Sequence, residues 1–140
     1  MDDLTTWLRA QLDDDERVAR AVQLHLWTVS TPPPDVAPIT LVANAGGSHY
    51  SHLAEGVRMH DPDGAVLHHA ARWDPARVLA EVDAKRRIID RYEDAVARQS
   101  DDDYSLIAAD VQAEEYRDWV LPLLALPYAD RPGYRSEWAP

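Results

Sequence analysis

The sequence contains neither cysteine nor phenylalanine. Without cysteine the chain can form no disulfide bond and perform no thiolate chemistry, and zinc sites that need sulfur ligands are excluded. Without phenylalanine, its five tryptophans and six tyrosines must supply all of the bulky aromatic packing. No apolar run approaches the roughly 20 residues that a membrane-spanning helix needs, so we expect no membrane association of that kind.

Several common functional motifs are also missing. The sequence has no P-loop, no dinucleotide-binding glycine fingerprint and no Cys-x-x-Cys pair, so we expect no cofactor. The glycine pair in residues 45–48 lacks the Gly-x-Ser-x-Gly spacing of a hydrolase nucleophile, so no catalytic residue is assigned. Residues 1–4 are acidic and lack the basic-then-apolar order of a secretion signal, so we expect a cytoplasmic protein.

The charge of the chain is strongly negative. Its 25 acidic and 14 basic residues give a formal net charge of −11 at pH 7. This charge disfavours direct binding to nucleic acid or to anionic lipid, and it favours a basic partner. The length of 140 residues suits one domain with its own hydrophobic core, while the oligomeric state is not readable from the sequence.

The order of apolar and helix-breaking residues predicts an α+β fold in a single domain, residues 1–140. We expect three main helices, a small antiparallel sheet inserted between the first and second helices, and an aromatic C-terminal tail packed on the helices. The predicted segments, in chain order, are a helix over residues 2–26, a proline-rich loop over 30–38, a small sheet over 39–69, helices over 75–98 and 104–125, and a packed tail over 127–140.

The helices are predicted from apolar residues at three- and four-residue spacing. The second helix has the clearest start, because Asp74 is a good N-cap and Pro75 fits the first helical position. In the third helix, Pro122 can introduce a kink near the end. The side chains expected to face inward in this third helix are Leu106, Ile107, Val111, Tyr116, Trp119, Val120, Leu123 and Leu124.

The sheet is predicted from short runs of strand-forming residues between turn signals. Residues 26–29 and 39–42 are candidate strands. Residues 56–60 and 65–69 are predicted as the two strands of a hairpin, since the Asp-Pro-Asp-Gly sequence between them suits a type I turn. About three strands are therefore expected, in line with the small sheets that such short segments form.

The C-terminal segment carries many aromatic residues for a tail. The helix-stopping Pro127 is followed by Tyr128, Tyr134 and Trp138. Disordered segments are poor in aromatic residues, so this tail is expected to pack on a surface. Packing within the chain is favoured, and packing on a neighbouring subunit or partner is the alternative. Tyr128, Tyr134 and Trp138 are therefore the candidate interaction residues.

Three blocks of sequence resemble a family of small proteins from actinobacteria and their phages that is catalogued as a domain of unknown function. The blocks are residues 8–20, 69–90 and 124–138, which cover both ends and the middle helix. In the family pattern the second block begins His-Ile-Ala-Arg-His-Asp-Pro. Its first histidine corresponds to His69, whereas Trp73 stands at the position of the second. The resemblance implies an origin and no transferable activity.

Five of the six histidines lie within residues 49–69, together with Asp61 and Asp63. Histidine and carboxylate are good ligands for zinc, nickel or iron, so a metal site is one hypothesis for this segment. The alternative is a set of polar side chains on a small sheet, because adjacent histidines on a strand point to opposite faces. The candidate metal ligands are His49, His52, His60 and His69.

Charged runs offer two further hypotheses. The acidic stretches 13–16 and 101–103, together with Asp110, Glu114, Glu115 and Asp118, could imitate the phosphate backbone of DNA, or could serve solubility alone. The basic residues of the second helix, among them Arg77, Arg91 and Arg98, could form a contact stripe. The interleaved acids favour ion pairing within the helix instead.

These observations together favour a small, acidic, noncatalytic protein that binds another protein. The partner is unknown, and its expected chemistry is basic because the chain is acidic. Two alternatives remain open: an acidic DNA mimic that inhibits a nucleic-acid-binding protein, and a histidine-dependent metal-binding protein or enzyme that uses residues 49–69.

Overall fold

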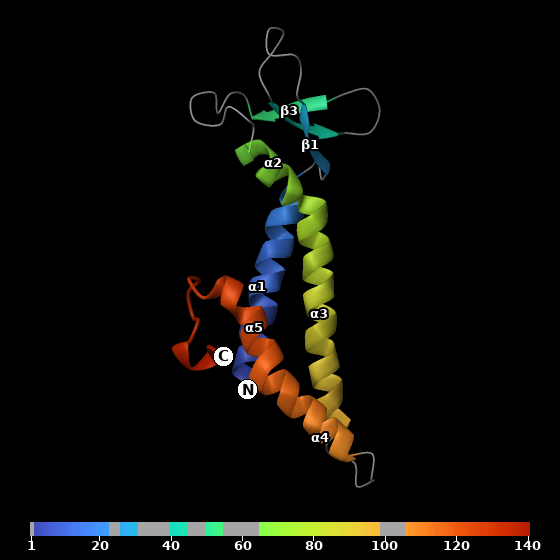
Figure 1. Ribbon diagram of the computed structural model, residues 1–140, viewed down its shortest axis with the longest axis vertical. Helices are drawn as coiled ribbons and strands as arrows, with labels where there is room; N and C mark the ends of the chain where they lie inside the picture. Colours follow the sequence, from blue (N-terminus) through green and yellow to red (C-terminus); the bar gives the residue numbers. More distant parts are fainter. Residues whose placement is uncertain (1, 23–25, 31–39, 45–49, 55–64, 99–105) are drawn as a thin grey trace. The chain divides into compact units, whose positions relative to one another are not determined.

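The computed structural model describes residues 2–22, 26–30, 40–44, 50–54, 65–98 and 106–140 (Figure 1). The chain divides into two compact units. The first, here called the helical unit, comprises Met1–Asp15 and Val82–Pro140, and the second, the sheet unit, comprises Glu16–Glu81. The helices α1 (Asp2–Ala21) and α3 (Pro75–Arg98) contribute residues to both. Each unit has buried apolar residues of its own.

In the helical unit, α1 buries a row of leucines. Leu4, Leu8 and Leu12 repeat at four-residue spacing and are almost completely buried, as expected for the apolar stripe of an amphipathic helix. The helix ends at Ala21, before the predicted end at residue 26. The earlier end has a local reason, because Trp27 and the residues after it are aromatic or β-branched and favour the strand that follows.

The boundaries of α3 are those that the sequence predicts. The Asp74 carboxylate accepts a hydrogen bond from the backbone N–H of Arg77 at 2.8 Å, which is the geometry of an N-cap. Pro75 takes the first helical position, and the helix ends at Arg98. The part of α3 in the helical unit buries Val82, Ile89, Tyr92 and Ala95.

The third predicted helix is three segments in the structure: α4 (Leu106–Glu115), a π-helical turn (Tyr116–Val120) and α5 (Leu121–Ala125). In the π turn the backbone N–H of Leu121 bonds to the oxygen of Tyr116, five residues earlier. Pro122 has no N–H to donate, and its ring crowds the preceding turn of a regular helix. The wider turn before Pro122 gives the ring that space, so the expected irregularity occurs as a π turn.

The π turn also determines which side chains of this segment face inward. The prediction that Val111, Trp119 and Leu123 are inward was wrong, because all three are exposed. Each four-residue step overshoots a full α-helical turn by about 40°, so the four steps from residue 109 to residue 125 would turn such a row by about 160° in a regular helix. The extra residue of the π turn compensates for part of this drift. The buried row is Ala109, Ala113, Leu121 and Ala125.

The sheet unit contains the predicted antiparallel sheet, inserted between α1 and α3. Its strands are β1 (Leu26–Ser30), β2 (Thr40–Asn44) and β3 (Tyr50–Ala54), and their order in the sheet is β1-β2-β3 (Figure 1). β1 and β2 correspond to the first two predicted strands. The register of the β2–β3 pair shifts between Leu41 and Val42, and both of these side chains are buried.

Residues 65–69 do not form the strand that was predicted for them. They begin α2 (Ala65–Arg72), so the predicted hairpin was wrong in its second strand, and β3 is the third strand of the sheet instead. The segment is rich in alanine, the best helix former, and buries only Leu67. α2 lies against β1 and β2. The predicted first strand of the hairpin, residues 56–60, lies outside the described residues.

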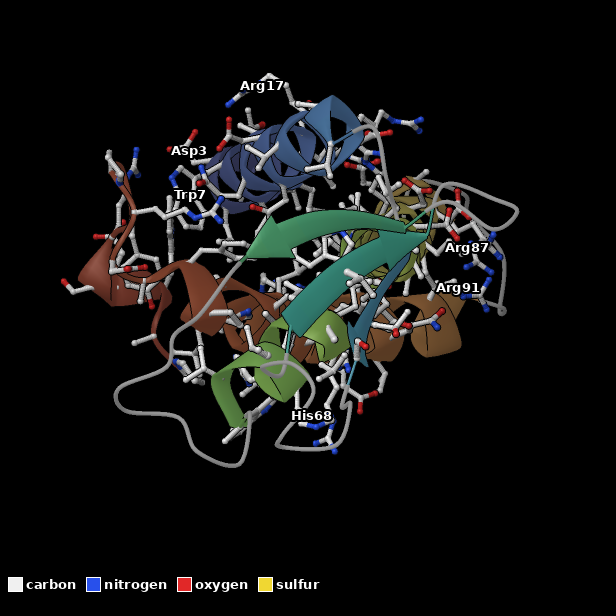
Figure 2. All side chains as sticks on the ribbon, turned by 90° about the horizontal axis from the view of Figure 1, so that it is seen from above. Asp3, Trp7, Arg17, His68, Arg87 and Arg91 are labelled. Carbon is white, nitrogen blue, oxygen red and sulfur yellow. The ribbon has the colours of Figure 1, made fainter. Side chains whose placement is uncertain are left out.

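The C-terminal tail packs on the helices, as the sequence predicts. After α5 the chain forms two single 3-10 turns, Leu126–Tyr128 and Ser136–Trp138. Tyr128 and Trp138 are buried in the helical unit. Figure 2 shows Trp7, which projects from α1, beside this tail. The tail is therefore part of the core of the helical unit.

Candidate docking surface

The three aromatic residues predicted as interaction residues gather around Trp7. The ring centre of Trp7 lies 6.5 Å from that of Tyr128, 5.7 Å from that of Tyr134 and 5.4 Å from that of Trp138. Edge-on and tilted arrangements at these distances are favourable for aromatic pairs. The tail aromatics thus bind the chain's own α1, and their use in binding a partner stays a prediction.

A polar network around Tyr128 anchors the same tail. Lys85 Nζ donates to the Tyr128 hydroxyl at 3.1 Å, and that hydroxyl donates to Asp15 at 3.0 Å. Arg131 pairs with the other oxygen of Asp15 at 2.6 Å. Burial lowers the pKa of Arg131, but the hydrogen bond and charge of Asp15 outweigh burial and leave this pKa raised. The network therefore joins the tail to α1 and α3 through charged side chains.

Ion pairs also neutralise other acidic side chains of the helical unit. Arg9 contacts Asp90 at 2.7 Å and Glu93 at 2.8 Å, and these hydrogen bonds, the one to Glu93 most strongly, raise the pKa of Arg9. Asp13 pairs with Arg86 at 2.6 Å. Carboxylates that form ion pairs with arginines of the same chain are less available to a partner than the free phosphates of a DNA backbone. Of the acidic stretches in the DNA-mimic hypothesis, Asp13 and Asp15 are paired with arginines, whereas residues 101–103 lie outside the described residues, so that hypothesis stays a prediction.

Basic residues of α3 form ion pairs within the helix, as the sequence favours. Arg87 pairs with Asp83 at 2.9 Å, the predicted acid-before-base pair four residues apart. Arg77 pairs with Glu81 at 2.9 Å. Figure 2 shows Arg87 and Arg91 on the same side of α3. Since pairing of this kind is typical of a solvated helix face, no basic contact stripe is assigned to α3.

The helical unit also carries a row of exposed apolar residues on the segment that contains the buried alanines. Trp119, Leu123 and Leu126 follow one another at four- and three-residue spacing, which places them on one side of the helical segment. Their exposed fractions are 63%, 52% and 43%. We call these three residues the α5 stripe. The segment thus buries Leu121 and three alanines, and it exposes three large apolar residues of types that are usually buried.

Acidic residues accompany the α5 stripe along the same segment. Asp110, Glu114, Glu115 and Asp118 are all exposed, and the one base between residues 106 and 128 is Arg117. Arg117 forms a two-point contact with Asp118, with Nε–Oδ1 at 2.7 Å. This hydrogen bond lowers the pKa of Asp118 below its usual range. The stripe therefore has an acidic border.

A second exposed apolar surface, in the sheet unit, lies on α2 and on Trp73, the residue that follows this helix. Val66 and Trp73 are 55% and 46% exposed. The guanidinium carbon of Arg77 lies 4.2 Å from the centre of the Trp73 ring, a cation–π contact, and the His69 ring lies 6.3 Å from it. We call Val66, His69, Arg72 and Trp73 the α2 face. Figure 2 shows His68, also exposed, beside this helix.

Of the four predicted metal ligands, the structure describes two, and these lie on different elements. His52 lies on β3, opposite Val42 in the sheet register, and His69 lies on α2. His49 and His60 fall outside the described residues. Within the part of the chain that the structure describes, no group of three or more histidine and carboxylate side chains is arranged to hold a metal ion. The metal hypothesis therefore stays a prediction, which a zinc-dependent change in Tm would test.

The α5 stripe was missed by sequence reasoning, because its large apolar residues were expected in the core. A signal was nevertheless present in the small residues. Ala109, Ala113 and Ala125 share a four-residue period with Leu121, and that period over four turns does not fit a regular helix. Such a row indicates a locally widened helix whose alanines face inward, which moves Trp119 and Leu123 outward.

A family model described as a family of unknown function (DUF6221) matches residues 1–140, the whole chain. No curated protein and no solved structure matches the sequence. Within the described ranges, no helix is both long enough and apolar enough to cross a membrane. The comparisons thus give the chain a family, and its chemistry has to come from its own surface.

Proposed function

Since the chain belongs to the family DUF6221, whose function is unknown, we propose its function from its own surface: a noncatalytic module that binds a basic, amphipathic helix of a partner protein on the α5 stripe. The observation that carries this proposal is the exposure of Trp119, Leu123 and Leu126 on one side of one helical segment. Contiguous exposed apolar residues with polar neighbours are typical of protein-binding surfaces.

The residue types of the stripe support this function. Tryptophan is strongly enriched among the residues that dominate binding energy, because it buries a large rigid surface at little cost in conformational entropy. Trp119 lies at the π turn, and π turns are frequent at functional sites. Apolar residues spaced four and three apart match the repeat of a helix, so a partner helix can pack along the stripe.

The charge of the surface specifies the partner's chemistry. The acidic border of the stripe repels an acidic partner and attracts lysine or arginine side chains beside an apolar core. The whole chain, with a net charge of −11, adds a longer-range attraction for a basic protein. Binding should therefore weaken as salt increases, because these border charges are exposed and screened.

The proposal is tested with two purified variants. In Trp119→Ala/Leu123→Ala the stripe is truncated, and in Val96→Ala a similarly exposed apolar residue on α3 is removed as the matched control. Native-host extract is passed over each immobilised protein, and every protein captured by the wild type is then purified and titrated. Loss of a central tryptophan costs about 2 kcal/mol or more, so the stripe variant should bind at least about 30-fold more weakly than the control.

Two results would count against this function. A captured protein that binds both variants with the wild-type Kd does not use the stripe. A stripe-dependent partner whose affinity is unaffected by salt lacks the basic chemistry proposed here. Because the substituted side chains are exposed, both variants should retain the wild-type Tm, which confirms that a change in Kd is not a consequence of unfolding.

A further inference from the structure

The chain itself carries a helix of the kind that the α5 stripe fits. We infer that the stripe of one copy binds the α2 face of a second copy, so that this protein associates with itself head to tail. This inference rests on the proposed function, because it names one occupant of the same stripe. Its support is the match in shape and charge between two exposed surfaces of one sequence.

The α2 face has the exposed apolar residues that packing on the α5 stripe requires. Val66 and His69 lie three residues apart on α2, so they share one side of the helix. Trp73 follows the end of the helix, and its ring lies 6.3 Å from that of His69, which extends the same row. The opposite side is occupied, because Leu67 is buried and α2 lies against β1 and β2. The outward side is therefore an exposed apolar row with a tryptophan near its end, similar in length and composition to the α5 stripe.

The α2 face also has the complementary charge. Residues 65–73 contain no acidic residue, although acids make up 25 of the 140 residues of the chain. Among these nine residues, Arg72 is exposed and supplies a positive charge. In the proposed contact this charge faces the exposed carboxylates of Glu114 and Glu115 in the acidic border of the stripe. An acidic border facing a basic border fixes the orientation of two helices and excludes other pairings.

Pairing of like surfaces is less favourable for both faces. Two copies of the α5 stripe would bring the carboxylates of Glu114, Glu115 and Asp118 together, and like charges in such an arrangement repel. Two copies of the α2 face would bring Arg72 of one copy near Arg72 of the other. The contact is therefore heterologous, with a different surface contributed by each copy.

A heterologous contact has a recognisable consequence for assembly. After two copies have joined, one stripe and one α2 face remain free at the ends, so further copies can be added. Each contact uses one short helix and a few side chains, an area at the low end of protein interfaces, so association should be weak. The average mass should then rise with concentration from the monomer value of 15.8 kDa and pass that of the dimer.

The test is sedimentation equilibrium of the full chain from low to high concentration, with two single variants. Trp119→Asp removes the stripe and Trp73→Asp removes the α2 face, so each variant alone should remain a monomer. An equimolar mixture should form a dimer and nothing larger, because each copy then contributes the one intact surface the other needs. Leu123→Asp and Val66→Asp form a second pair with the same expected results, which covers a variant that fails to fold.

The controls are Val96→Asp and Val18→Asp, which place the same charge at exposed apolar positions outside both faces and should associate like the wild type. A wild type that stays monomeric at every concentration would overturn the inference. So would assembly that stops at a dimer, or a mixture that contains only monomers. None of these outcomes affects the proposed function, which fails only if no basic partner depends on Trp119 and Leu123.

Discussion

The indole Nε1–H of Trp7 donates a hydrogen bond to the backbone oxygen of Pro132 at 3.1 Å, across 125 residues of sequence. The next residue, Gly133, has a φ of +84°, in the region that favours glycine. A Cβ atom placed on Gly133 would lie 3.0 Å from Nε1 of Trp7. The second turn of α1 and the tail are therefore fitted to one another at a position where only glycine avoids both strain and crowding.

Gly133→Ala should destabilise the protein by about 1–3 kcal/mol, because the new side chain combines a strained backbone with a close contact to Trp7. The measurement is the free energy of unfolding in urea, monitored by tryptophan fluorescence. The same change in a Trp7→Leu background separates the two causes, since the crowding disappears there and the strain remains. An unchanged free energy in the wild-type background would contradict the fit described here.

The two tail tyrosines should respond differently to loss of the hydroxyl group. Tyr128→Phe removes the oxygen that accepts from Lys85 and donates to Asp15, so it should cost about 1–3 kcal/mol. The hydroxyl of Tyr134 is buried and has no hydrogen-bond partner among the residues that the structure describes. Tyr134→Phe should therefore leave stability unchanged or slightly increased.

This pair of tyrosine variants is its own control, because each removes one oxygen atom from a ring beside Trp7. Thermal unfolding of both variants gives the comparison directly. Equal losses in Tm would mean that the hydrogen bonds of Tyr128 contribute no more than the packing of any buried hydroxyl. A larger loss in Tyr134→Phe would indicate an unrecognised partner for that oxygen.

Local signals account for the parts of the fold that the sequence predicted well. The start of α3 is specified by Asp74 and Pro75, which act within one turn, and its end at Arg98 follows the last residues of the apolar pattern. The aromatic tail was predicted to pack because of its composition. That Trp7 receives it could not be predicted, since no local pattern encodes a contact over 125 residues.

The errors arose where a local pattern was ambiguous or where packing overrode it. Residues 65–69 form too short a run for periodicity to separate a strand from a helix, and the turn signal before them favoured the wrong choice. Trp119 and Leu123 were assigned inward by their apolar character alone. Their exposure depends on the π turn, which shifts the facing of the helix by one residue, and this shift defines the candidate site.

Replacing Arg117 should change the titration of Asp118. The hydrogen bond from Arg117 holds the pKa of Asp118 below its usual range in the folded protein. A lowered folded-state pKa means that the stabilising contribution is present above the unfolded pKa of about 4 and is lost as pH falls through the lower, folded value. In Arg117→Gln the Asp118 midpoint should move upward, as measured by carboxyl NMR.

The control for that titration is Arg87→Gln, which removes an arginine that pairs with Asp83 on α3 and should leave the Asp118 midpoint unchanged. An upward shift in both variants would assign the effect to the net charge of the chain rather than to the contact with Arg117. Because both ion pairs are largely open to solvent, neither variant should alter Tm at neutral pH by a measurable amount.

Alanine substitutions of Leu121 and Leu123 compare the buried and the exposed sides of the helical segment most directly. Leu121 is completely buried and Leu123 is about half exposed, although both are leucines two residues apart. Leu121→Ala should cost about 2–5 kcal/mol, since it removes buried methyl groups and leaves a cavity. Leu123→Ala should cost less than about 0.5 kcal/mol in the isolated protein at low concentration, as is usual for exposed positions.

The difference between these two leucine variants depends on the π turn. In a regular helix without the extra residue, the side chains after Tyr116 would be rotated by about 100°, the angle between successive residues, and the facing of the two leucines would change with it. Chemical denaturation of both variants gives the comparison. A larger loss of unfolding free energy for Leu123→Ala than for Leu121→Ala would mean that Leu123 is not on the surface. The proposed docking of a basic helix on the α5 stripe would then have no basis.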